Sequence, residues 1–219
     1  GVGQAMQALP SLYGANARVG VVGLGTGTLA CYAKPGQAWR FYEIDPAVVR
    51  LARGPFRFLE QCLPDARIVL GDARLRLVEE PAHSLDLLVL DAFSSDAVPM
   101  HLMTLEAFAT YDRVLAKDGL LLVHISNRFL SLEPVVERAA KLGGWSAAQL
   151  TYHPPLIEEL NEAATSDWIA LSRSPEKLAQ LTARADGWRP LEGRPGFTPW
   201  TDDYATILPV LRSLNKDLP

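Results

Sequence analysis

The stretch Arg18-Val19-Gly20-Val21-Val22-Gly23-Leu24-Gly25-Thr26-Gly27 begins with an apolar run and ends with glycine at alternate positions. A short apolar run bounded by glycines predicts a buried strand, and a glycine-rich turn after it lets the backbone approach a ligand closely. We expect the helix that follows, to about Ala33, to offer its first N–H groups to the polar part of that ligand. Gly23, Leu24, Gly25, Thr26 and Gly27 are therefore predicted binding residues.

The rest of the chain continues an alternation of short apolar runs and helical stretches. Further strands are predicted at residues 38–43, 66–70, 85–90 and 120–125, and helices at 46–53, 105–115 and 132–142. Residues 146–152 and 168–172 are expected to pair as an antiparallel hairpin. The pattern predicts an α/β fold with a mostly parallel, seven-stranded sheet and helices on both faces.

The 219 residues fit one domain, with a lead-in at about 1–17, a core at 18–173 and a C-terminal extension at 174–219. The chain opens like the middle of a segment, so we consider that it is a fragment of something longer. The connection at 153–166 is long enough for a lid. The segment Asp202-Asp203-Tyr204 is a candidate docking tail, helix cap or substrate clamp, and the sequence does not distinguish these three alternatives.

Composition excludes several classes of protein. The net charge of -4, with scattered Lys and Arg, argues against nucleic acid as a partner. No apolar run approaches the roughly 20 residues of a membrane span. Cys31 and Cys62 form no CxxC pair, so we expect free thiols, a reducing compartment and a cytoplasmic location. No second His or Cys stands at metal-ligand spacing from His101 or His124, so no metal is predicted.

Glu43 ends the second strand about 20 residues after Gly23, where a carboxylate can accept both hydroxyls of an adenosine ribose. Glycine clusters also occur in turns that bind nothing, and the spacing with Glu43 is what favours a ligand. Dinucleotide folds prefer G-x-G-x-x-G, whereas Thr28 occupies the sixth place here. A nicotinamide dehydrogenase is therefore the less favoured alternative.

Three more acids follow strands, at the sheet edge where α/β folds bind ligands. Asp72 can accept from an adenine amino group, or simply cap the next helix. Asp91 lies where the reactive end of a cofactor is expected. It is a candidate base for an amine, and an Asx-turn that ends the strand is the structural alternative. Asp96 is a candidate substrate contact or a solvated loop residue. Asn127 is a candidate pocket residue, with a solvated turn as the alternative.

Four segments together resemble the spermidine synthase (polyamine aminopropyltransferase) family, from about Gln4 to Ala140. They are residues 21–27, Phe41-Tyr42-Glu43-Ile44-Asp45, Gly71-Asp72-Ala73 and Asp86-Leu87-Leu88-Val89-Leu90-Asp91. Residues 91–99 and 124–127 look like the spermidine-synthase-like domains often joined to bacterial membrane segments.

The resemblance implies a Rossmann-like class I methyltransferase fold that binds S-adenosylmethionine, decarboxylated S-adenosylmethionine or methylthioadenosine; S-adenosylhomocysteine would be the product of methyl transfer. It implies that Gln4 and Ile44 contact the cofactor, with Glu43 on the ribose and Asp72 and Ala73 near the adenine. Asp91 would assist deprotonation of a small amine substrate, and a homodimer is expected.

The family's glycine loop carries an aspartate where this chain has Thr26, and the tyrosine that usually precedes the glutamine is Gly3. The stretch after Asp91 is longer than the family's pattern, and the N-terminal β-domain is missing. These departures affect the amine side of the site. Methyl transfer and aminopropyl transfer therefore both stay open, as does a non-catalytic sensor or regulatory domain for an adenosine ligand.

Overall fold

The computed structural model describes residues 1–92, 98–154, 165–184 and 186–212. Its strands are β1 (Arg18–Val22), β2 (Ala38–Glu43), β3 (Arg67–Leu70), β4 (Leu85–Leu90), β5 (Leu115–His124), β6 (Ser146–Tyr152), β7 (Ser166–Ser172) and β8 (Arg189–Pro190). Its α-helices are α1 (Val2–Tyr13), α2 (Pro46–Arg53), α3 (Phe58–Cys62), α4 (Ala73–Glu79), α5 (Leu105–Val114), α6 (Glu133–Gly143) and α8 (Pro175–Thr182). Short 3-10 helices are η1 (Thr28–Tyr32), η2 (Met100–Leu102) and η3 (Leu208–Val210).

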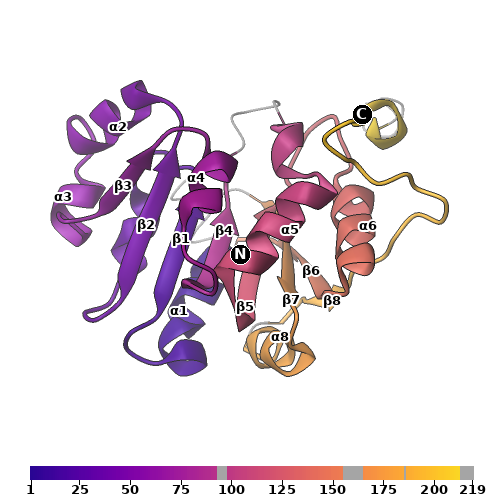
Figure 1. Cartoon of the computed structure of the whole chain (residues 1–219). Coiled ribbons are helices and arrows are strands. Elements are labelled where there is room, and N and C mark those ends of the chain that lie inside the picture. Colours follow the sequence, from indigo (N-terminus) through magenta and orange to yellow (C-terminus); the bar gives the residue numbers. More distant parts are fainter. Residues whose placement is uncertain (93–97, 155–164, 185, 213–219) are drawn as a thin grey trace.

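The strands form one sheet in the order β3-β2-β1-β4-β5-β7-β6-β8 (Figure 1). The first five strands along the chain are mutually parallel, and β7, β6 and β8 pair antiparallel. The predicted α/β fold and the closing hairpin are confirmed. The predicted count of seven strands was wrong, because the two-residue strand β8 adds an eighth. Such a short edge strand, which includes Pro190, shows no periodicity in the sequence.

Two apolar cores cover the two faces of the sheet (Figure 1). Helices α4, α5 and α6 close one face, and α1, α2, α3 and α8 close the other. Strand β4 contributes to both cores, since Leu88 and Leu90 face one and Leu87 and Val89 face the other. Burial on both faces is what the continuous apolar run of β4 predicts. The residue after it, Asp91, is therefore held at a rigid edge.

Three elements differ from the sequence-based expectation. The predicted lead-in contains α1, with a buried face that includes Met6 and Leu9. The helix after the glycine loop is the short 3-10 helix η1, and Pro35 soon after it disfavours continuation. Strand β5 begins at Leu115 rather than at Leu120. Residues 155–164 of the predicted lid lie outside the described residues.

Cys31 and Cys62 form a disulfide, with their Cα atoms 4.7 Å apart. The prediction of free thiols was wrong. The pairing joins η1 to α3, which contact each other although 31 residues separate the two cysteines. Cysteine spacing alone does not contain this information, because the contact depends on how α3 folds back against the end of the glycine loop. In the described part of the chain, no helix is long and apolar enough to cross a bilayer.

Candidate active site

A cavity of about 410 Å³ opens at the carboxyl ends of the parallel strands. This volume lies within the range of small-molecule sites. Seven residues predicted from the sequence line it, and they are Gly23, Gly25, Glu43, Ile44, Asp72, Ala73 and Asp91. The fold thus brings together residues from four separate strand ends.

The glycine loop has a backbone that only glycine accepts easily. Gly23 has a φ of 94°, and a β-carbon there would collide with the carbonyl oxygen of Asp91. Gly25 has a φ of 53°, and a β-carbon there would meet nothing within 4 Å. Because Gly25 also lines the cavity, this open space belongs to the site. Gly23 therefore lets β1 and β4 approach, and Gly25 leaves room for a ligand.

Glu43 is buried, with 8% of its surface exposed, and both carboxylate oxygens are oriented by backbone N–H groups. Leu24 N donates to Oε2 at 3.0 Å, and Asp45 N donates to Oε1 at 2.9 Å. Each oxygen can accept a further hydrogen bond. A buried, pre-oriented carboxylate beside an open glycine fits the ribose diol of an adenosine cofactor. The exposed Ile44 adds an apolar wall next to it.

Asp72 has both of its carboxylate oxygens engaged. Oδ1 accepts from Leu75 N at 2.9 Å and caps α4, so the structural alternative considered from sequence is real. Oδ2 lies 2.9 Å from Nε2 of His101, which also lines the cavity. Asp72 still lines the cavity, so it can cap the helix and accept a further hydrogen bond there. His101, which the sequence analysis considered only as a metal ligand, joins Asp72 at this end of the site.

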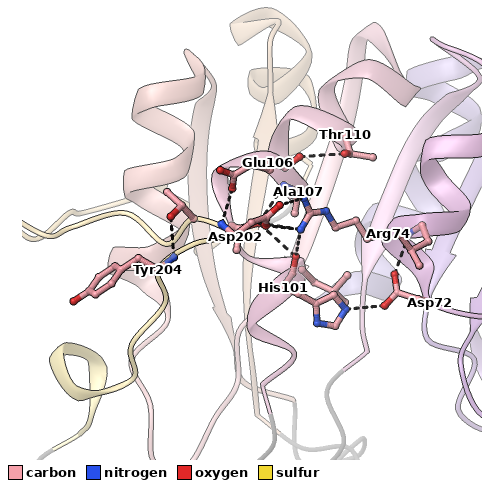
Figure 2. Close-up of polar contacts among 12 residues, drawn as sticks. Asp72, Arg74, His101, Glu106, Ala107, Thr110, Asp202 and Tyr204 are labelled. Atoms are coloured by element: carbon pink, nitrogen blue, oxygen red, sulfur yellow. Dashed lines mark hydrogen bonds and ion pairs between the residues drawn. The ribbon is translucent and has the colours of Figure 1, made fainter.

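Asp202 docks the C-terminal extension beside this part of the cavity (Figure 2). Its carboxylate accepts two hydrogen bonds of 2.6 Å from the Arg74 guanidinium and one of 2.8 Å from the Thr104 hydroxyl. The hydrogen bonds from Arg74 lower the pKa of Asp202 to about 2. Arg74 also donates to the carbonyl oxygen of His101. The three sequence-based alternatives for Asp202 therefore resolve to docking at the start of α5.

Asp91 lies against His124, which the sequence analysis considered only as a metal ligand. Its Oδ1 is 2.8 Å from Nδ1 of His124, whose Nε2 is 2.8 Å from the Ser126 hydroxyl oxygen. A signal for this pair does exist in the sequence. Asp91 and His124 each fall at the carboxyl end of a predicted buried strand, and neighbouring parallel strands end at the same edge.

Other predicted residues do not line the cavity. Gln4 lies on α1, where its side chain accepts from the Gly1 amino group. Leu24 is buried, and the residues that line the cavity do not include Leu24, Thr26 or Gly27. Asn127 is buried and its Oδ1 accepts from Phe129 N and Leu130 N, which makes it a turn-stabilising residue. Asp96 lies outside the described residues.

Solved structures of other proteins share this fold. The chain has the α/β fold of Rossmann-like S-adenosylmethionine-dependent methyltransferases and spermidine synthases, as likenesses to solved structures show. It superposes on a probable spermidine synthase from Corynebacterium glutamicum with a TM-score of 0.64 and 18% identity, over 87% of this chain and 72% of that one. It superposes on the O-methyltransferase TomG from Streptomyces achromogenes, in complex with SAM, with a TM-score of 0.55 and 14% identity, over 79% and 80% of the two chains.

A sequence relative gives the more particular likeness. The chain is 31% identical over 112 residues to a polyamine aminopropyltransferase from Vibrio vulnificus, which covers 49% of this chain and 37% of that protein. The predicted resemblance to the spermidine synthase family is confirmed. The match spans little more than a third of the relative's length. No protein-family model matches the chain.

Proposed function

We propose that this chain is a transferase domain that binds an S-adenosylmethionine-type cofactor and moves an aminopropyl or methyl group from it to a small amine. One observation carries the proposal: Gly25, Glu43, Asp72 and Asp91 line one cavity at the carboxyl edge of the sheet. Glu43 and Gly25 suit the adenosine part, and Asp91 suits the reacting amine. The single-domain organisation, the homodimer and the amine partner belong to this proposal as predictions.

The residues of the chain have distinct roles in this reaction. When bound, a sulfonium cofactor supplies a carbon that an amine lone pair can attack, with the thioether leaving. Glu43 would hold the ribose and fix the cofactor's orientation, since in-line geometry is the main requirement of such a transfer. Asp91 would accept a proton from the ammonium form of the substrate, which exposes the lone pair for attack.

The choice between methyl and aminopropyl transfer depends on the ligand that binds. Thr26 replaces the aspartate expected in the glycine loop of aminopropyltransferases, and this weighs towards methyl transfer. Thermal-shift measurements should compare S-adenosylmethionine, decarboxylated S-adenosylmethionine, methylthioadenosine and NAD. Stabilisation by an adenosyl-sulfur ligand supports the proposal, whereas stabilisation by NAD alone would indicate the dehydrogenase alternative.

Turnover separates an enzyme from a ligand sensor. Transfer to a panel of small amines should be followed by mass spectrometry with the wild-type chain and with Asp91→Asn. We expect the variant to keep cofactor binding and to lose transfer, because the amide cannot accept a proton. A wild-type chain that binds the cofactor and transfers nothing to any amine would instead be a sensor domain.

The compartment is a separate prediction. A cytoplasmic location was expected from sequence, and the disulfide argues against it, because structural disulfides are rare in the reducing cytosol. Alkylation of free thiols in intact cells tests this point. Protection of Cys31 and Cys62 from alkylation without prior reduction would place the domain in an oxidising compartment.

A further inference from the structure

Asp91, at the end of β4, lies at one level with two residues of the neighbouring strands β5 and β7. Leu90 of β4 pairs with Val123 of β5, so Asp91 and His124 are the next pair in this parallel register. His124 in turn pairs with Trp168 on the antiparallel strand β7. The His124 ring stacks on the Trp168 ring, with centroids 4.6 Å apart and planes inclined by 12°. The sheet therefore fixes both the position and the plane of the imidazole beside Asp91.

A chain of hydrogen bonds indicates which nitrogen of this imidazole carries the proton. Asp167 N donates to the Ser126 hydroxyl oxygen at 2.7 Å, and a backbone N–H can only donate. The hydroxyl hydrogen of Ser126 is then available to Nε2 of His124, at 2.8 Å. Because a carboxylate oxygen can only accept, this pattern fits a ring proton on Nδ1, which lies 2.8 Å from Asp91 Oδ1. In this arrangement, backbone geometry at the β5–β7 edge determines which histidine nitrogen faces the acid.

His124 acts from behind the cavity rather than inside it. Asp91 lines the cavity and its side chain is 33% exposed, whereas His124 is not among the lining residues and its side chain is 22% exposed. Oδ1 of Asp91 faces His124, and Oδ2 accepts no hydrogen bond from any residue in the described ranges. The nearby acid on β7, Asp167, accepts from the Thr151 hydroxyl at 2.7 Å. Asp91 thus keeps one oxygen for a substrate N–H.

We propose that His124 is a positioning residue that orients Asp91 for deprotonation of the amine, an inference that rests on the function proposed above. The Nδ1–H donor holds Oδ1 of Asp91 and leaves Oδ2 directed to the substrate. The proton released by the substrate ammonium group would pass to Oδ2. The nitrogen lone pair would then form a bond to the carbon next to sulfur as the carbon–sulfur bond breaks and the thioether leaves. Ser126, which follows β5, and Trp168 of β7 therefore support the acid that follows β4.

Two substitutions at His124 separate positioning from packing. His124→Phe keeps an aromatic ring against Trp168 and removes both ring nitrogens, whereas His124→Gln keeps an N–H donor for Asp91. We expect His124→Phe to lower kcat at least about tenfold with cofactor Kd within about twofold of wild type, and His124→Gln to recover part of the rate. His83→Asn is the matched control, since His83 precedes β4 at the opposite edge of the sheet.

A second readout does not need turnover. Nitrogen-15 NMR of the free protein should show the Nδ1–H tautomer at His124, and Asp91→Asn should shift its ring signals. Equal rates and pH profiles in wild type, His124→Phe and His124→Gln would overturn the inference and leave the proposed function standing, as would an Nε2–H tautomer. No transfer by the wild-type chain to any amine would overturn the proposed function and, with it, the inference.

Discussion

Arg74 on α4 donates two hydrogen bonds of 2.6 Å each to the carboxylate of Asp202, 128 residues further along the chain. The two side chains are 18% and 45% exposed, so the pair lies at the protein surface. Leu105 N also donates to the Trp200 carbonyl oxygen, which adds a backbone contact at the start of α5. These contacts tie the C-terminal extension to α4, which Asp72 caps, and to the start of α5.

Loss of the Arg74–Asp202 pair should loosen this extension locally. We expect Asp202→Asn to speed hydrogen–deuterium exchange over residues 200–206 and to lower the global free energy of unfolding by less than about 1 kcal/mol, because solvent screens an exposed pair. Asp203→Asn is the matched control on the neighbouring exposed carboxylate. Exchange that is equally slow in all three proteins would show that backbone contacts alone dock the extension.

The same pair predicts a pH dependence in acid. The hydrogen bonds from Arg74 lower the pKa of Asp202 from 3.8 to about 2. The stabilisation is therefore fully present above about pH 4 and is lost as the pH falls through about 2, where the folded carboxyl group takes up its proton. The difference in urea-unfolding free energy between wild type and Asp202→Asn should shrink between pH 4 and pH 2. A difference that grows in this interval contradicts the assignment.

The disulfide should contribute substantially to stability. A cross-link over a separation of 31 residues is expected to stabilise the fold by about 3–4 kcal/mol, through the restricted unfolded chain. Chemical denaturation with and without reductant measures this, and the Cys31→Ala/Cys62→Ala double variant controls for side effects of the reductant. A change in unfolding free energy below about 1 kcal/mol would mean that the cross-link constrains little.

Comparing Gly25→Ala with Gly196→Ala separates the effect of filling the ligand-binding space from the effect of backbone strain. Gly25 and Gly196 both have positive φ values, of 53° and 75°, and neither would place a β-carbon within 4 Å of another residue. Alanine should cost about 1–2 kcal/mol of stability at either position. Only Gly25 lines the cavity, so only Gly25→Ala should weaken binding of an adenosyl-sulfur ligand, by about tenfold or more in calorimetry. Equal affinities in both variants would move the ligand away from this loop.

Glu43→Gln tests the ribose contact. The amide group would bring an NH₂ against one of the backbone N–H donors of Leu24 and Asp45 and would remove a charged acceptor. We expect the Kd of the adenosyl-sulfur ligand to rise about 10- to 100-fold. Glu60→Gln on α3, where the carboxylate is 64% exposed, is the control and should bind like wild type. Unchanged affinity in Glu43→Gln would exclude a ribose at this carboxylate.

Local patterns in the sequence were enough to predict the alternation of strands and helices, the glycine loop and the acids at the strand ends. It could do so because burial on both faces of β4 and the positive φ angles of the loop are local requirements that select residue types directly. The cavity acids Glu43, Asp72 and Asp91 followed from their positions after strands.

The contacts between residues that are far apart in the sequence depend on the tertiary structure. The Cys31–Cys62 disulfide, the Arg74–Asp202 pair and the Asp91–His124 contact each join segments at least 31 residues apart. Their partners depend on strand order and on how loops fold back, which no local periodicity encodes. The eighth strand escaped prediction for the same reason, since β8 exists only as a partner of β6.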